Sequence, residues 1–195
     1  IARYRLGIEH FDRRVFELSN TQLDRPFQSE DGAGLWSCRA LIGHIFDTEL
    51  LYNMRLRRTL AEDAPVLENF DEHAFIDSPL SGMHGRTPGE PGIKQPIGAM
   101  AASVHTLRQT MAAALYQLAP AEWDRRAMHP QRGPVTFRDL LAIATAHLEH
   151  HARFLNAKVE RFLGPAPEPA SCEDHAAKPG GCGSGCACAA PTAEP

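Results

Sequence analysis

Three histidines lie on the apolar faces of two predicted helices. His44 follows Leu41 by three residues and precedes Thr48 by four, which is helical spacing. His147 and His151 are four residues apart, so they lie one above the other on a single helix face. Three neutral imidazoles from two facing helices would bind one divalent ion, Zn²⁺, Ni²⁺ or Fe²⁺. Such a site leaves a coordination position open for water or substrate.

The same histidines could instead be ordinary core residues. The chain has 10 histidines, so a pair four residues apart also arises by chance. Against this reading, three buried rings without an ion would need hydrogen-bond partners for both nitrogens of each ring. His150 is the main competitor for His151, and we expect it to project toward Ile143 and Phe154. The others are expected at the border of an apolar stripe (His105) or in solvated polar and loop positions (His10, His73, His84 and His129).

The apolar spacing predicts four helices, over residues 4–23, 37–60, 97–118 and 137–163. Ser37 can cap the second helix, and Thr136 with Asp139 resembles a capping box at the start of the fourth. Between the second and third helices lies a long connection, residues 61–96, rich in proline and glycine, with a short helical turn expected near 69–75. No segment alternates convincingly with a period of two. These elements predict an all-α four-helix bundle whose second connection crosses over the bundle end.

The last 32 residues differ in composition from the rest. Residues 164–195 contain no Leu, Ile, Val, Met, Phe, Tyr or Trp, but they contain four of the 5 cysteines. We therefore expect a bundle over residues 1–163 and a disordered tail over 164–195. The tail could hold a second site for a soft metal such as Cu⁺ or Zn²⁺, formed by Cys172, His175, Cys182, Cys186 and Cys188. The alternative is an unstructured tail whose cysteines do little, because their spacing matches no standard zinc template.

The overall charge argues against polyanionic partners. The formal net charge is -4 and the sequence pI is about 6.2, so the basic face of a nucleic-acid binder or anionic-membrane binder is not expected. No apolar run reaches the roughly 18 residues that span a bilayer, and Arg3 and Arg5 interrupt the first residues. For the chain as given, which begins at Ile1, we expect a cytoplasmic protein.

Several reactive side chains near the histidines can be interpreted in two ways. Cys38 has either a thiolate favoured by a helix N-terminus or a packed thiol. Asp47 and Glu49 follow His44, but neither shares its face closely enough to be named as a general base. The cationic group at the end of the second predicted helix could face an anionic substrate or simply complement the helix dipole (Arg55, Arg57 and Arg58).

Two stretches of the chain resemble the DinB/YfiT-like superfamily. One is Trp36-Ser-Cys-Arg-Ala-Leu-Ile-Gly-His44 with its continuation to Glu49. The other begins at Pro134-Val-Thr-Phe-Arg-Asp-Leu-Leu and includes Ala146-His147-Leu-Glu-His-His151. The resemblance implies a four-helix bundle in up-down-down-up order. It also implies a metal held by one histidine of the second helix and an HxxxH pair of the fourth, here His44, His147 and His151.

The resemblance also implies an activity. Members include S-transferases and isomerases that use low-molecular-weight thiols such as bacillithiol or mycothiol, and metal-dependent hydrolases. We therefore expect a metal-dependent enzyme that activates a thiol or water for S-transfer or hydrolysis, with a small-molecule substrate or thiol as partner. The alternatives are a non-enzymatic metal handler whose Cys-rich tail captures soft metal, and a metal-free interaction bundle. The oligomeric state stays open, with a homodimer as one alternative.

Overall fold

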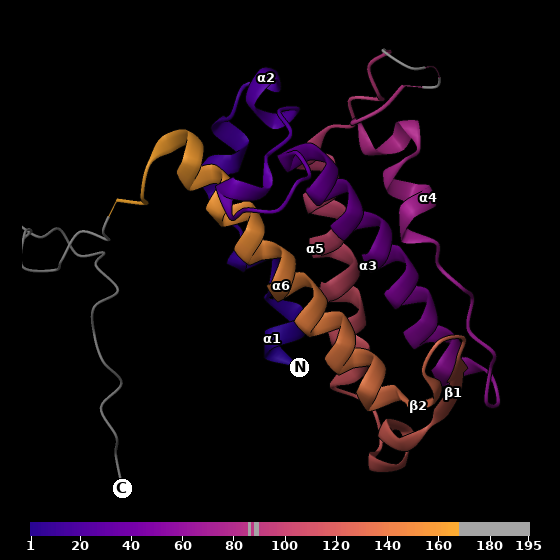
Figure 1. The fold of residues 1–195 in the computed structure, drawn as a ribbon. Helices are drawn as coiled ribbons and strands as arrows, with labels where there is room; N and C mark the ends of the chain where they lie inside the picture. Colours follow the sequence, from indigo (N-terminus) through magenta and orange to yellow (C-terminus); the bar gives the residue numbers. More distant parts are fainter. Residues whose placement is uncertain (86, 88–89, 168–195) are drawn as a thin grey trace, which may run out of the picture. The chain divides into compact units, whose positions relative to one another are not determined.

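The computed structural model describes residues 1–85, 87 and 90–167. Residue contacts separate Ile1–Gly164 from Pro165–Pro195, and the elements below belong to the first of these units. Most of this unit is helical, as Figure 1 shows. No helix in the described part of the chain is both long enough and apolar enough to cross a membrane.

Three long helices form the frame of the bundle. They are α3 (Cys38–Ala61), α5 (Ile97–Leu115) and α6 (Phe137–Leu163). Helix α3 packs against both α5 and α6. The fourth position is filled by the N-terminal segment, whose first helix, α1 (Ala2–Arg5), packs against α5 and α6. The predicted all-α four-helix bundle is therefore confirmed, although its first member is not one continuous helix.

Side-chain caps start the two helices that carry the histidines. The Ser37 hydroxyl accepts a hydrogen bond from the Ala40 N–H at 3.2 Å, at the start of α3. At the start of α6 the Thr136 hydroxyl accepts from the Asp139 N–H at 3.1 Å, and the Asp139 carboxylate accepts from the Thr136 N–H at 2.9 Å. These bonds satisfy N–H groups that the helices cannot pair internally. Both predicted helix starts are confirmed.

The prediction of a single helix over residues 4–23 is wrong. The segment consists of α1, two short 3-10 helices (Gly7–His10 and Arg13–Glu17) and the four-residue helix α2 (Asn20–Leu23). Asp12 and Ser19 interrupt it, because their side chains accept hydrogen bonds from backbone N–H groups a few residues later. The Asp12 carboxylate accepts from the Arg14 N–H at 3.0 Å, and the Ser19 hydroxyl accepts from the Gln22 N–H at 3.3 Å. Such local bonds offer the backbone an alternative to a continuous helix.

The apolar spacing in this segment still predicts what is buried. Phe11, Val15 and Leu18 lie in the core although they belong to different short pieces. Residues three apart face the same side in α-helical and 3-10 turns alike, so an apolar residue at every third position does not distinguish the two.

The long crossover between α3 and α5 is confirmed, and it approaches the site. It contains α4 (Glu72–Ile76), close to the predicted turn, which begins where the Asp71 carboxylate accepts from the Ala74 N–H at 3.0 Å. The crossover is tied to a later part of the chain, because the Leu67 N–H donates to the Met128 carbonyl at 2.9 Å. Helix α4 also contacts α3.

A β-hairpin precedes α6, and the expectation of no strand pattern is wrong there. Strands β1 (Arg126–His129) and β2 (Gly133–Thr136) pair antiparallel, with Ala127 opposite Val135. Ala127 and His129 are buried and Arg126 and Met128 are exposed, so β1 does alternate. Four residues are too few to establish a period, and β2 contains Gly133 and Pro134, residue types that usually mark turns.

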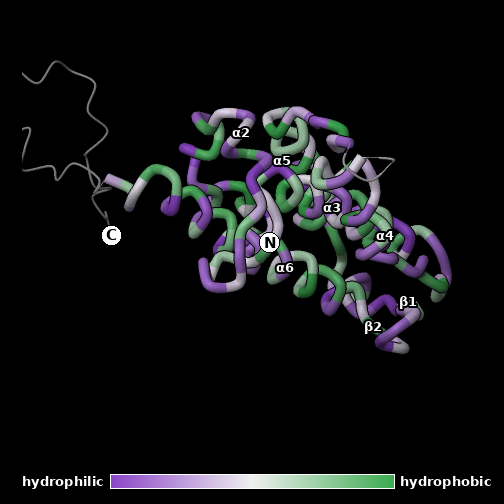
Figure 2. The backbone as a smooth tube through the Cα atoms, turned by 45° about the horizontal axis from the view of Figure 1, so that its top comes forward, coloured by the Kyte–Doolittle hydropathy of each residue, from purple (hydrophilic) through white to green (hydrophobic). Residues whose placement is uncertain are grey.

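The core has two apolar clusters, one at each end of the long helices. Figure 2 shows hydrophobic and hydrophilic residues alternating along these helices, as amphipathic helices require. The first cluster includes Ile45 and Val104, and the second includes Leu56 and Met111. On α3, Glu49 lies between Ile45 and Leu56. On α5, Arg108 lies between Val104 and Met111, and both charged residues are buried. The clusters thus meet at a buried pair of opposite charges.

Candidate metal centre

Helices α3 and α6 bring His44, His147 and His151 together. His44 lies two turns into α3, and the other two lie on the face of α6 that packs against α3. One nitrogen from each ring can be chosen so that all three lie within 4.8 Å of one another. The ring centroids are 4.5 to 5.1 Å apart. The predicted convergence of these three side chains is therefore present in the structure.

The closest pair has the spacing that a shared ion requires. His44 Nε2 and His147 Nε2 are 3.2 Å apart. Two nitrogens bound to a tetrahedral Zn²⁺, each at 2.0–2.1 Å, would be separated by about 3.3 Å. The donors are three imidazole nitrogens without a carboxylate or thiolate, which suits Zn²⁺, Ni²⁺ or Fe²⁺ better than a hard ion such as Mg²⁺. The residues present therefore fit a divalent transition-metal ion.

The surroundings orient the rings. The Thr48 hydroxyl donates to the His44 carbonyl at 2.7 Å, which leaves its oxygen free to accept from His147 Nδ1, 3.5 Å away. A proton on Nδ1 of His147 would leave the Nε2 lone pair facing His44. The Trp36 indole stacks on the His151 ring, with centroids 6.1 Å apart.

Burial keeps these histidines neutral. It lowers the pKa of His44, and only the Glu72 carboxylate acts in the opposite direction. Burial together with the neighbouring histidines lowers the pKa of His147 to about 3 and that of His151 to about 3. A neutral imidazole has a free lone pair, whereas a protonated one cannot bind a metal. All three lone pairs are thus available at neutral pH.

Comparison with known proteins identifies the family. The sequence profile of the DinB superfamily matches residues 3–155, most of the chain and all of the bundle up to the histidine pair. This chain belongs to the DinB superfamily. The expected resemblance is confirmed.

Several relatives of this DinB-superfamily chain bear similar names. A protein of Oceanobacillus iheyensis named "Putative metal-dependent hydrolase" is 24% identical over 147 residues, covering 75% of this chain and 76% of its own. A Bacillus mycoides protein with the same description is 22% identical over 150 residues, covering 77% of this chain and 78% of its own.

A solved structure shares the fold. It is YfiT from Bacillus subtilis, described as "a probable metal-dependent hydrolase with an unusual four-helix bundle topology". The match has a TM-score of 0.67 at 20% identity and covers 85% of this chain and 86% of that one. At this identity the likeness establishes the bundle fold.

Within the described ranges, the remaining histidines of this DinB-superfamily chain lie outside the cluster, and one of them corrects a prediction. His150 contacts the Phe154 ring, as expected, with centroids 5.0 Å apart, and its own ring lies beside His151. His129 was expected to be solvated, but it is only 7% exposed. The β-hairpin, which the sequence pattern did not reveal, turns His129 inward.

The structure shows the environment of the other reactive side chains near the cluster. Glu49 is paired with Arg108 at 2.7 Å, so it is not free to act as a base. Asp47 is half-buried, and burial raises its pKa to about 6. Burial raises the pKa of the Cys38 thiol to about 11, so Cys38 is a packed thiol rather than a thiolate. The predicted soft-metal residues lie outside the described residues: Cys172, His175, Cys182, Cys186 and Cys188.

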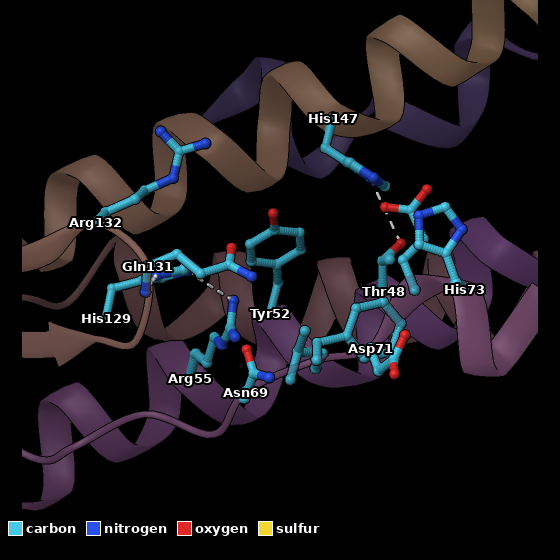
Figure 3. Close-up of a pocket in the computed structure, with 13 residues that line it drawn as sticks. Thr48, Tyr52, Arg55, Asn69, Asp71, His73, His129, Gln131, Arg132 and His147 are labelled. Carbon is cyan, nitrogen blue, oxygen red and sulfur yellow. Dashed lines mark hydrogen bonds between the residues drawn. The ribbon is translucent and has the colours of Figure 1, made fainter.

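A cavity of about 460 Å³ opens beside the cluster. Figure 3 shows His147 and Thr48 at one end of it, Arg132, Gln131 and His129 of the hairpin region at the other, and Tyr52 between them. A smaller apolar cavity of about 210 Å³, lined by Trp36 and Phe154, lies against His151 on the other side. Ligand sites in proteins commonly have the size of the larger cavity.

Sequence reasoning missed most of the cavity. Glu72 lies in the crossover and Arg132 in the hairpin turn, where no periodic pattern marks an inward side chain. Tyr52 did have a signal, since it falls on the apolar stripe of α3 eight residues after His44. Of the three arginines at the end of α3, only Arg55 lines the cavity, whereas Arg57 is exposed and Arg58 pairs with Glu62 and Glu68.

Proposed function

We propose that this protein is a metal-dependent hydrolase whose divalent ion is held by His44, His147 and His151. The observation that carries the proposal is the convergence of three neutral imidazoles at one end of a cavity of ligand size. Three protein nitrogens leave a coordination position open, which is the arrangement of catalytic zinc sites. The names of the relatives support the same reaction class.

A bound divalent ion would lower the pKa of a coordinated water and polarise a substrate carbonyl. Tyr52 is placed to assist the reaction as a hydrogen-bond donor. Its ring lies 5.7 Å from that of His147, and burial raises its pKa against the opposing charges of Arg55 and Arg132. Its hydroxyl therefore stays protonated and can donate a hydrogen bond to negative charge that develops on the substrate.

Glu72 is the candidate proton acceptor. It lines the same cavity as His147, and its charge opposes the lowering of the His44 pKa by burial, which places it near the histidine cluster. It forms no ion pair with any residue in the described ranges. We propose that the Glu72 carboxylate takes the proton of the attacking water, a role that Glu49 cannot fill because Arg108 occupies it.

A test combines metal loading with a base variant. Zinc-loaded protein is assayed against a panel of small esters and amides, beside Glu72→Gln and the neighbouring variant Glu68→Gln. Glu72→Gln should lower kcat by about 10²–10⁴, the usual contribution of a general base, without changing metal content. Full activity in Glu72→Gln would reject the base. Hydrolysis that survives both His44→Ala and chelation would reject the metal.

Thiol activation is separated from hydrolysis by cobalt substitution. Co²⁺-loaded protein is mixed with cysteine or with another low-molecular-weight thiol, and the near-ultraviolet absorption is recorded. The hydrolase proposal predicts no sulfur-to-cobalt charge-transfer band, and turnover that does not depend on thiol. A strong band with thiol-dependent turnover would assign S-transfer to the site instead.

Metal handling is separated from catalysis by stoichiometry. The full chain and a variant with Cys172, Cys182, Cys186 and Cys188 replaced by Ser are titrated with Zn²⁺ and Cu⁺. The hydrolase proposal needs one ion per chain in both proteins, bound at the histidines. Additional soft metal that only the cysteine-containing chain takes up, and passes on to a competing chelator, would support a metal handler.

A further inference from the structure

The end of the cavity away from His147 is rich in hydrogen-bond donors. Arg55 of α3 and His129 of β1 line it, together with Gln131 and Arg132 from the hairpin turn (Figure 3). The acidic side chains of the cavity, Asp71 and Glu72, belong instead to the start of α4, near the histidine cluster. The cavity is therefore electrically polarised along its length.

Arg55 is a buried cation without a matching anion. Its side chain contacts the Glu68 carbonyl at 2.6 Å and His129 Nε2 at 3.1 Å, and the residue is only 3% exposed. Its Nε atom has no hydrogen-bond partner among the described residues. No carboxylate in those ranges forms an ion pair with it, and the Glu68 carboxylate pairs with Arg58. A guanidinium with five N–H donors is thus only partly satisfied.

His129 faces donors on both sides. Its Nε2 lies 3.1 Å from the Arg55 guanidinium, and its Nδ1 lies 3.2 Å from the Gln131 N–H. A neutral imidazole has only one acceptor nitrogen, so one of these two contacts pairs a donor with a donor. The charges of Arg55 and Arg132 add to burial in lowering the pKa of His129. This corner of the cavity therefore lacks an acceptor with negative charge.

Tyr52 links this corner to the histidine cluster. Its ring lies 5.7 Å from the His147 ring and 5.8 Å from Arg55 Cζ. The imidazole and the guanidinium are thus separated by no more than the sum of these distances, which a small molecule can span. A molecule that contacts Arg55 at one end would lie along Tyr52 and reach the histidines with the other.

We propose that Arg55, His129 and Arg132 form an anion subsite that binds a carboxylate or phosphate group of the substrate. Arginine is suited to both groups, because its planar fork of donors matches two oxygens at once. The substrate would be a small acid whose reactive carbonyl lies at the opposite end of the molecule from its anionic group. The role in selecting a substrate rests on the proposed hydrolase function, whereas anion binding itself does not.

The test measures anion binding in metal-free protein, so that it is independent of metal chemistry. Succinate and inorganic phosphate are titrated separately into the ¹⁵N-labelled full chain, and the Arg Nε–H resonances are followed. The Arg55 Nε–H signal should shift and saturate with at least one of the two anions. The anion that binds more tightly identifies the group as a carboxylate or a phosphate.

Variants decide which side chains bind the anion. Arg132→Gln, an exposed change that leaves the core intact, should raise Kd at least tenfold, and Arg132→Lys should restore part of the loss. Arg57→Gln, an exposed change on α3 outside the cavity, should leave Kd unchanged. Equal Kd values for wild type, Arg132→Gln and Arg55→Lys would overturn the proposal. So would binding that appears only after zinc is added and ignores both arginines, since the anion would then bind at the histidines. If the wild-type chain bound the anion but took up no divalent metal, the hydrolase function would be rejected and the anion subsite would stand.

Discussion

Arg108 and Glu49 form an ion pair in the middle of the bundle, with Arg108 Nε donating to Glu49 Oε2 at 2.7 Å. The other Glu49 oxygen accepts from the Tyr4 hydroxyl at 2.9 Å. The remaining guanidinium nitrogens donate to the carbonyls of Tyr4 at 3.0 Å and Ala144 at 2.8 Å. One buried guanidinium therefore connects α1, α3, α5 and α6, and it holds the N-terminal segment on the frame that positions the histidines.

Replacing Arg108 by Met should destabilise the fold strongly. The change leaves the Glu49 carboxylate buried without its counter-ion, which typically costs about 3–5 kcal/mol. Urea denaturation of the metal-free protein would measure the loss in unfolding free energy. Arg3→Met is the control, because Arg3 forms an exposed ion pair with Glu149 and should barely move the midpoint. Similar midpoints for the two variants would contradict the structural role of the buried pair.

Gly7 packs against the same guanidinium. A Cβ at position 7 would overlap the terminal nitrogen of Arg108 and approach Leu148 Cδ2 at 3.1 Å. Because a hydrogen bond to the Tyr4 carbonyl holds that nitrogen in place, Gly7→Ala should cost about 1–3 kcal/mol, as overpacking usually does. Gly98→Ala is the matched control, since nothing lies within 4 Å of its Cβ and alanine favours a helix. In an Arg108→Met background the Gly7→Ala penalty should shrink. An equal penalty in both backgrounds would disprove the contact.

The metal-free protein should be sensitive to acid. The pKa values of His147 and His151 are lowered to about 3, while those of an unfolded chain are near 6.5. Between these values the unfolded state binds more protons than the folded state, so the free energy of unfolding falls as pH falls from about 6.5 toward 3. Urea midpoints at several pH values would record the slope. His147→Gln should flatten it, and the exposed His10→Gln should not. A slope unchanged in His147→Gln would mean that this imidazole is not buried and neutral.

Cys38 should be chemically inert in the folded protein. It is buried, and burial raises its pKa to about 11, so almost no thiolate exists at pH 7. In a chain whose other cysteines are replaced by Ser, a thiol reagent should modify Cys38 only after denaturant is added. Rapid modification of the native protein would show that α3 begins in a more open arrangement.

The long helices and the histidine cluster were predictable from sequence because they depend on spacing. Leu41, His44 and Thr48 repeat at helical intervals, and an HxxxH pair on a second helix faces them once both stripes are buried. The caps at Ser37 and Thr136 were readable for a related reason, since short polar side chains there satisfy free N–H groups. These features are local, so neighbouring residues determine them.

The cavity was not predictable, because its walls come from contacts distant in sequence. His129 is turned inward by a hairpin of four-residue strands, and Glu72 reaches the site through a crossover whose path depends on pairing near Met128. The break-up of the N-terminal helix depends on Asp12, whose N–H donates to Asn156 of α6 at 2.8 Å. The spacing of residues along the sequence does not show which distant segments pair.

The most direct measurement of the central claim is the metal content of four single variants. His44→Ala, His147→Ala, His151→Ala and His150→Ala are purified in parallel, loaded with Zn²⁺, dialysed against a weak chelator and assayed by elemental analysis. Each of the first three removes one of three converging nitrogens, whereas His150 lies beside the cluster without joining it. We predict one zinc per chain in wild type and His150→Ala, and almost none in the other three. Zinc retained in those three variants, or lost equally from His150→Ala, would contradict the three-histidine centre.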